Sequence, residues 1–197
     1  MKVSPFDFTI GHGQWAEQIR YFTTELDPNY WKNFRPCTVD EILTIERETQ
    51  RTLPEDFKEF LRIFGHGSFV WPFLGGIYDP DEIISVCHAH LWTFLQSGDW
   101  ASGEEQQKFY VSRGVFNPNP EKFTPDVLTT EYGNLFDLMQ IGTDGLCGYH
   151  LLGVASPPAS FGYGLLDVQG GVNDMAGSFS DGLRHILNHH WMGENEE

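Results

Sequence analysis

Residues 38–67 read TVDEILTIERETQRTLPEDFKEFLRIFGHG, and this stretch decides the fold. Thr38 and Glu41 have the spacing of a capping box, in which each side chain accepts a hydrogen bond from the backbone amide of the other residue. A helix is therefore predicted to begin at Thr38. Its buried side is predicted to consist of Ile42, Ile45 and Thr49.

Leu53-Pro54 predicts the start of a second helix, because a proline at the first helical position needs no amide partner. Glu55 and Asp56 fall in the first turn, where the helix dipole favours acidic side chains. Gly65 is predicted to end this helix. The residues with the spacing of a core-facing helix side are Phe57, Phe60, Leu61 and Phe64.

Upstream of this block, residues 13–26 predict an amphipathic helix. The aromatic residues between 30 and 34 are costly to leave in water, so we expect them to pack against the main body. We interpret residues 1–36 as an N-terminal helical extension of a domain that spans 37–192. The face of the predicted helix is formed by Trp15, Ile19, Phe22 and Leu26.

Downstream of the block, residues 68–78 predict one strand with a bulge or bend, because Pro72 cannot donate to a ladder. A short turn or helical segment is expected around Ile83 and Ile84, and another helix over 87–96. Residues 97–134 are rich in Gly, Asn and Pro and are interpreted as an insertion, with one strand candidate at 109–115.

The C-terminal third predicts a hairpin, a strand and a closing helix. Asp144-Gly145 lies between apolar runs at 135–141 and 147–152, which is typical of a tight turn. A strand follows at 163–168, and Ser178 or Ser180 is predicted to cap the last helix. Helices at both ends with strands between them predict an α+β fold, a mostly antiparallel sheet flanked by helices. The expected buried side of the last helix is Phe179, Leu183, Ile186 and Leu187.

Charge narrows the classes of partner. The chain has 197 residues, a length typical of one domain, and carries 28 acidic residues against 12 Lys and Arg, a formal net charge of −16. Such an excess argues against binding to nucleic acid or to an anionic membrane. Residues 131–197 hold nine acidic residues and a single basic one, Arg184. This acidic surface either keeps the protein soluble or binds a basic partner.

The cysteines and the apolar runs indicate the cellular compartment in which the protein is expected. Cys37, Cys87 and Cys147 are odd in number and form no C-x-x-C pair, so neither a disulfide framework nor a thiolate zinc site is predicted. No apolar run has the length of a signal peptide or of a membrane span. We therefore expect a soluble protein of the reducing cytoplasm.

Histidine offers the strongest catalytic candidates. His185 and His189 are one helical turn apart and could present two imidazoles to a metal ion. His190 belongs to the same cluster of histidines, and His88 and His90 form a second cluster. A third ligand is needed, and no Glu lies between the pair as in HExxH. No nucleophile motif or phosphate loop is present. The sequence therefore predicts no enzyme, no cofactor and no metal. A metal-dependent enzyme that uses the histidine clusters is kept as an alternative, ranked after two protein-binding hypotheses.

The block from Thr38 through Glu46, Leu53-Pro54 and Phe57 to Gly65-His66-Gly67 resembles the opening signature of the SUKH superfamily, the Smi/Knr-like cell-wall regulators and bacterial immunity proteins. Residues 141–151 resemble the hairpin of that family, and residues 178–187 resemble its closing helix. The resemblance covers 37–192, interrupted near 97–134. His66 and Cys147 depart from the family pattern, which often has Asn and a small or polar residue there.

The resemblance implies a SUKH fold and a non-enzymatic protein-binding module, most often an immunity protein that neutralises a toxin. Because many toxins are basic nucleases, an acidic inhibitor would be steered toward them. The alternative is a regulatory or scaffolding protein of the cell-wall-signalling branch. Glu46 is expected either to stabilise the fold or to contact a partner. From charge and loop placement, the predicted partner-binding residues are Asp144, Asp167, Asp174 and Asp181, with Tyr149 and Tyr163 as exposed aromatic anchors.

Overall fold

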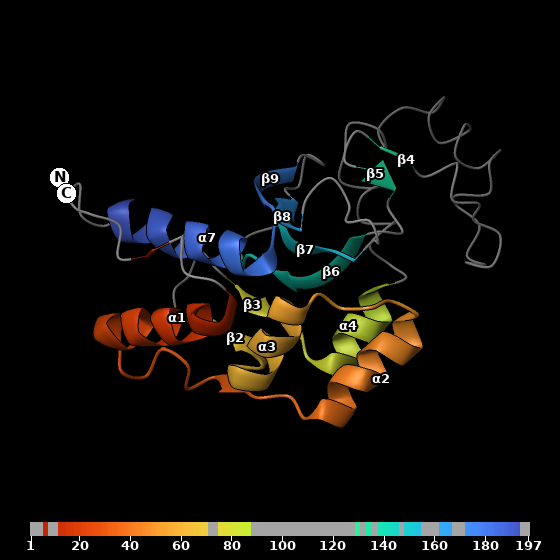
Figure 1. Cartoon of the computed structure of the whole chain (residues 1–197), viewed down its shortest axis with the longest axis horizontal. Coiled ribbons are helices and arrows are strands. Elements are labelled where there is room, and N and C mark those ends of the chain that lie inside the picture. Colours follow the sequence, from red (N-terminus) through yellow and green to blue (C-terminus); the bar gives the residue numbers. More distant parts are fainter. Residues whose placement is uncertain are drawn as a thin grey trace.

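The computed structural model describes residues 6–7, 12–70, 75–87, 129–130, 133–134, 138–145, 148–154, 162–166 and 172–193. Within these ranges helices pack against one open sheet, which confirms the predicted α+β class (Figure 1). The helices are α1 (His12–Leu26), α2 (Val39–Thr49), α3 (Glu55–Ile63), α4 (Pro80–Cys87) and α7 (Phe179–Gly193). The strands are β1 (Phe34–Arg35), β2 (His66–Ser68), β3 (Gly76–Ile77), β4 (Thr129–Thr130), β5 (Gly133–Asn134), β6 (Leu138–Thr143), β7 (Tyr149–Gly153), β8 (Tyr163–Leu166) and β9 (Val172–Ala176).

The main sheet has the order β1-β2-β3-β6-β7-β8-β9, and every neighbouring pair in it is antiparallel. Strands β4 and β5 form a separate pair. The β6–β7 hairpin was predicted from its Asp-Gly turn, and Gly145 has the positive φ of +80° that such a turn requires. The predicted mostly antiparallel sheet is thus confirmed.

Helices α2 and α3 form as their sequence predicts. The capping box is present, because the Glu41 amide donates to Thr38 Oγ1 over 3.2 Å and the Thr38 amide donates to Glu41 Oε2 over 2.7 Å. Pro54 is the N-cap of α3, so this helix begins at Glu55, one residue later than predicted. All of the expected core residues of the two helices are buried: Ile42, Ile45, Thr49, Phe57, Phe60, Leu61 and Phe64.

Gly65 ends α3 and fixes how the chain enters the sheet. Its φ is +92°, and a Cβ atom at this position would lie 1.7 Å from the carbonyl oxygen of Arg35 in β1. Only glycine permits both the left-handed backbone and this close approach. The prediction that Gly65 ends the helix is therefore confirmed, and its position seats β2 against β1.

The N-terminal helix belongs to the same hydrophobic core as the rest of the fold. Trp15 and Ile19 of α1 are fully buried in one cluster with Phe60 of α3 and with Leu187 of α7. The predicted aromatic linker also packs inward, since Tyr30 is buried. Residues described between 12 and 36, although expected as an extension, therefore contribute to the core of the domain.

Two strand predictions need correction. Residues 68–78 do not form one bent strand, because β2 and β3 pair antiparallel with Gly67 opposite Ile77. Strand β9 was not predicted at all, since its sequence VNDMA has no apolar alternation. The strand predicted at 109–115 and most of the helix predicted at 87–96 lie outside the described residues, as does most of the insertion near 97–134.

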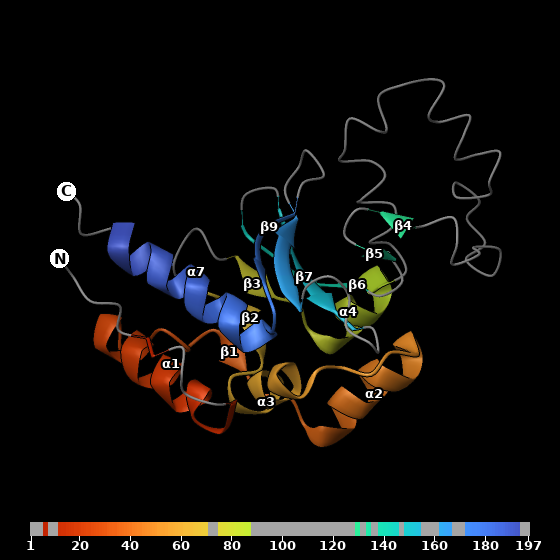
Figure 2. The same ribbon diagram turned by 45° about the horizontal axis from the view of Figure 1, so that its top comes forward.

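The helices divide into two groups along the sheet. Figures 1 and 2 show α1 beside α7 at one end of the molecule, α2 beside α4 at the other, and α3 between them. Helix α7 is capped by Ser178, whose Oγ accepts from the Asp181 amide over 3.1 Å, as one of the two predicted serines. No helix in the described ranges is long and apolar enough to cross a membrane.

Glu46 links α2 to α3, which identifies a structural role for this residue. Its Oε1 accepts a hydrogen bond from the Leu53 amide over 2.9 Å and lies 3.3 Å from Lys58 Nζ. Lys58 also pairs with Glu55 at 2.6 Å, and its side chain is only 17% exposed. The carboxylate therefore fixes the loop that orients the two helices.

Replacement Glu46→Ala is expected to lower the free energy of unfolding by about 1–2 kcal/mol, because the Leu53 amide loses its acceptor. Urea unfolding followed by circular dichroism measures the difference. The matched control is Glu48→Ala, whose carboxylate pairs with the exposed Arg47 and should change stability by less than about 0.5 kcal/mol. Equal effects of the two variants would contradict the structural role.

Candidate functional site

Several hollows open on the described surface. One of about 650 Å³ lies between α3 and the start of α7, and we call it the α3–α7 hollow. One of about 450 Å³ lies between α2 and α4, and we call it the acidic hollow. One of about 390 Å³ lies over β2 and β3 and shares the lining residues His66 and Asp79 with the acidic hollow, so the two hollows adjoin.

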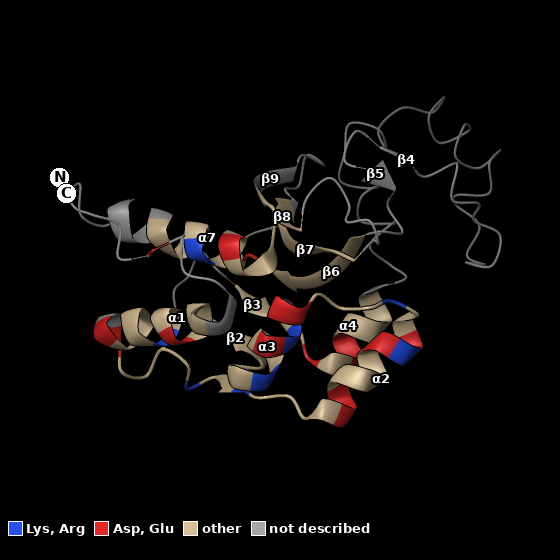
Figure 3. Ribbon diagram, in the orientation of Figure 1, with Lys and Arg blue, Asp and Glu red and all other residues tan. Residues whose placement is uncertain are grey.

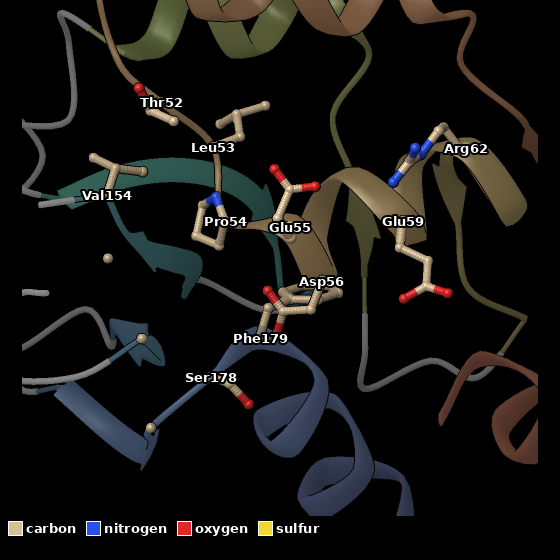
Figure 4. A pocket seen from close by; sticks show the side chains of 13 residues that line it. Thr52, Leu53, Pro54, Glu55, Asp56, Glu59, Arg62, Val154, Ser178 and Phe179 are labelled. Carbon is tan, nitrogen blue, oxygen red and sulfur yellow. The ribbon is translucent and has the colours of Figure 1, made fainter. Parts of the chain in front are cut away.

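The α3–α7 hollow has the volume of a small-molecule site, but two of its three carboxylates, those of Asp56 and Glu59, serve the fold (Figure 4). Asp56 Oδ2 accepts from the Ser180 amide over 2.8 Å, so the carboxylate satisfies an orphan donor at the start of α7. Glu59 Oε2 accepts from the Trp15 indole over 2.9 Å. The polar groups of this hollow therefore join helices and do not converge on its centre.

The charged lining of the acidic hollow comes from three separate pieces of chain. Strand β1 supplies a guanidinium, the first turn of α2 supplies two carboxylates, and the segment before and inside α4 supplies two more. The adjoining hollow over β2 and β3 adds Glu82, so the two hollows together have five carboxylates against one guanidinium. The charged lining residues are Arg35, Asp40, Glu41, Asp79, Asp81 and Glu82. Figure 3 shows acidic residues on α2 and α4, and also on α3.

Some of these carboxylates serve the fold, and others face solvent. Glu41 pairs with Arg35 at 2.7 Å, and Asp79 Oδ1 accepts from the Glu82 amide over 2.8 Å at the start of α4. Asp40 and Asp81 are exposed and form no ion pair with any residue in the described ranges. Two unpaired carboxylates thus lie on opposite walls of the hollow, one on α2 and one on α4.

His66 lines both of the adjoining hollows. Burial, and then the nearby Arg35, lower the pKa of His66, although Asp79, Glu41 and Glu82 oppose this shift. The lowered pKa favours the neutral imidazole over the charged one. Its Nε2 atom is buried and has no hydrogen-bond partner among the residues the structure describes.

The Arg35–Glu41 ion pair is expected to make the stability of the fold depend on pH. The hydrogen bond from Arg35, followed by that from the Thr38 amide, lowers the pKa of Glu41 to about 2. Because the folded-state pKa lies below the ordinary value of 4.5, this contribution to stability is present above pH 4.5. It is lost as the pH falls through the folded pKa of about 2.

Replacement Arg35→Gln removes the guanidinium and is expected to raise the pKa of Glu41 toward its ordinary value. Titration of the Glu41 side-chain carboxyl by NMR measures the shift directly. Arg47→Gln, which alters an exposed pair with Glu48, is the control and should leave the pKa of Glu41 unchanged. A pKa of Glu41 that stays low in Arg35→Gln would contradict the assigned cause.

Two of the predicted partner-binding residues lie at the β6–β7 turn. Asp144 Oδ1 accepts from the Gly148 amide over 2.8 Å, so this carboxylate helps to close its own turn. Tyr149 begins β7 and is half-buried. The turn borders the candidate site, because Thr143 and Gly145 line the hollow over β2 and β3.

The prediction of Tyr163 as an exposed anchor is wrong. Its side chain is 1% exposed and its ring packs against Phe179, with ring centroids 5.5 Å apart. The hydroxyl is hydrogen-bonded to Nδ1 of His150, which is also buried. Because strand β8 turns this side chain into the core beneath α7, it cannot reach a partner.

Of the other three predicted carboxylates, only Asp181 has a described side chain, and it does not line the candidate site. Asp181 lies in the first turn of α7 and forms an ion pair with the buried Arg184. Asp167 lies outside the described residues, and Asp174 is described only as part of the β9 backbone. Of the predicted acidic set, the described side chains are those of Asp144 and Asp181, and neither lines the acidic hollow. Asp40 and Asp81, which were not predicted as partner-binding residues, occupy the first turns of two helices, where the helix dipole favours acidic side chains.

The histidines predicted as metal ligands are only partly described. His185 is exposed on α7, whereas His88 and His90 and the side chains of His189 and His190 lie outside what is described. Among the described residues, no three His, Cys, Asp or Glu side chains lie close enough to hold a metal ion. Cys37 is a buried free thiol whose pKa is raised to about 11, chiefly by burial.

Comparison with known proteins gives no match, since neither a protein-family model nor a curated protein matches this chain.

Proposed function

We propose that this protein is a non-catalytic protein-binding module of the cytoplasm, an immunity protein that neutralises a basic toxin domain through the acidic hollow. The observation that carries the proposal is the meeting of five carboxylates from separate chain segments, four of them around the acidic hollow and Glu82 in the hollow that adjoins it. Two of them, Asp40 and Asp81, are exposed and unpaired within the described chain. The resemblance of residues 37–192 to SUKH immunity proteins supports the same reading.

The physical basis is electrostatic complementarity. A nuclease must present a cationic surface to hold phosphates, and a protein of net charge −16 attracts such a surface over a range that salt limits. Exposed carboxylates around a hollow concentrate that attraction at one place. The inhibitor then covers the groups that would otherwise hold the nucleic acid, so inhibition needs no chemistry by the inhibitor.

The test is inhibition of a panel of basic nuclease domains of bacterial toxins, measured by cleavage of a fluorescent oligonucleotide. We expect one domain of the panel to be inhibited at equimolar protein. Catalytically inactive copies of the same domains should bind equally well, because the interaction does not depend on turnover. Binding without inhibition would favour the regulatory or scaffolding alternative, and the absence of binding across the panel would contradict the proposed function.

A further inference from the structure

The exposed side of α2 carries two aliphatic side chains beside the acidic hollow. Val39 is 61% exposed and Leu43 is 52% exposed. They are four residues apart and therefore lie one above the other on the same helix face. Two of the four large hydrophobic residues that are exposed in the described chain thus share this single turn, and we call the pair the α2 aliphatic strip.

The strip and the hollow are adjacent because of the helical repeat. Asp40 and Thr44 each follow a strip residue by one position, are also four residues apart, and line the acidic hollow. Asp81, from the first turn of α4, lies on the opposite wall. The surface therefore presents apolar area along one edge and unpaired negative charge along the other.

We infer that the α2 aliphatic strip and the acidic hollow together form the docking site for an amphipathic, positively charged segment of the partner protein, with aliphatic side chains on the strip and lysine or arginine in the hollow. The inference rests on the proposed function and names the part of the partner that binds. Charge complementarity selects this occupant, because the carboxylates repel an acidic segment and would be left without partners by a wholly apolar one.

The two halves of the site have separable roles. Exposed ion pairs are weak and screened by salt, so Asp40 and Asp81 chiefly accelerate association. Apolar contact is not screened by salt, so Val39 and Leu43 chiefly slow dissociation. A segment that has only one of the two properties therefore binds more weakly than one that has both.

The experiment uses a fluorescent synthetic peptide of about 14 residues, a length that forms about four helical turns, built from lysine and leucine with leucine on one face. A second peptide has glutamine in place of every lysine, and a third has serine in place of every leucine. The intact protein is tested together with the variant Asp40→Asn/Asp81→Asn and the variant Leu43→Asn. The matched controls on α1 are Glu17→Gln/Glu25→Gln and Tyr21→Asn, and Tyr21 is 71% exposed.

We expect the lysine–leucine peptide to bind most tightly. Neutralising Asp40 and Asp81 should raise its dissociation constant about tenfold, and Leu43→Asn should raise it about fivefold, while the α1 controls stay within about twofold. Because all the altered side chains are exposed, circular dichroism should show unchanged folding. Absence of peptide binding, equal losses in the α1 controls, or indifference to Leu43→Asn would overturn the docking site. The nuclease panel tests inhibition of a toxin separately, so failure of the docking site and failure of the proposed inhibition can be told apart.

Discussion

Replacement of Phe179 by alanine is expected to lower the free energy of unfolding by about 3–5 kcal/mol, the largest effect of any single change considered. Phe179 is 1% exposed, and its ring centroid lies 4.9 Å from that of Phe57 and 5.1 Å from that of Phe60. It also contacts Trp15 of α1 and Tyr163 of β8 in edge-to-face geometry. A cavity at this point would separate α7 from three other elements.

Chemical unfolding monitored by far-ultraviolet circular dichroism measures this loss. Domains of this kind have total stabilities of about 5–15 kcal/mol, so the variant is expected to unfold at markedly lower denaturant or to be only partly folded. Tyr21→Ala is the control, because Tyr21 is exposed and its loss should change stability by less than about 0.5 kcal/mol. A loss below about 1 kcal/mol in Phe179→Ala would contradict the described core.

Replacement Asp56→Asn is expected to lower the free energy of unfolding by about 2–3 kcal/mol. The Asp56 side chain is 6% exposed and accepts hydrogen bonds from the Phe57 amide and the Ser180 amide, 124 residues away. Asparagine retains one acceptor oxygen but turns an NH₂ group toward a backbone donor. Its buried amide therefore leaves one of these donors unpaired at a helix N-terminus.

The matched control is Glu55→Gln, one residue earlier in the same helix turn. Its side chain is 81% exposed and pairs only with Lys58, so the loss should be less than about 1 kcal/mol. Thermal unfolding of both variants gives the comparison. Hydrogen exchange at the Ser180 amide adds a local measure, because Asp56→Asn should accelerate exchange there. Similar stabilities of the two variants would contradict the assigned link between α3 and α7.

Local signals in the sequence predict the helices well. The capping box at Thr38 and the apolar spacing from Phe57 to Phe64 are satisfied within a few residues, so no distant contact is needed to recognise them. Strand β9 escapes such recognition, because VNDMA gains its strand conformation by pairing with β8 and not from its own pattern. The β2–β3 pair also forms by pairing between strands, which the pattern of residues 68–78 does not reveal.

The candidate site could not be predicted from the sequence, because it depends on tertiary contact. The excess of acidic over basic residues is greatest in residues 131–197. The acidic hollow is instead lined by Arg35, Asp40 and Asp81, which the fold brings together. The role of Asp56 was equally hidden, since its partner Ser180 lies far along the chain. The sequence does contain Val39 and Leu43 four residues apart, at positions that are exposed in the fold. Aliphatic residues at such positions depart from the usual polar surface of a helix.

The most direct test of the role of the acidic hollow is the rate at which the protein associates with a basic nuclease domain that it inhibits. Stopped-flow fluorescence measures this rate at about 50 mM and about 300 mM salt. The protein is compared with Asp40→Lys/Asp81→Lys and with the α1 variant Glu17→Lys/Glu25→Lys, which changes net charge equally at the other end of the molecule. Docking at the hollow predicts a rate that falls about tenfold with salt and about tenfold in the first variant, with a much smaller change in the second. A rate indifferent to salt, or lowered equally by the two variants, would contradict it.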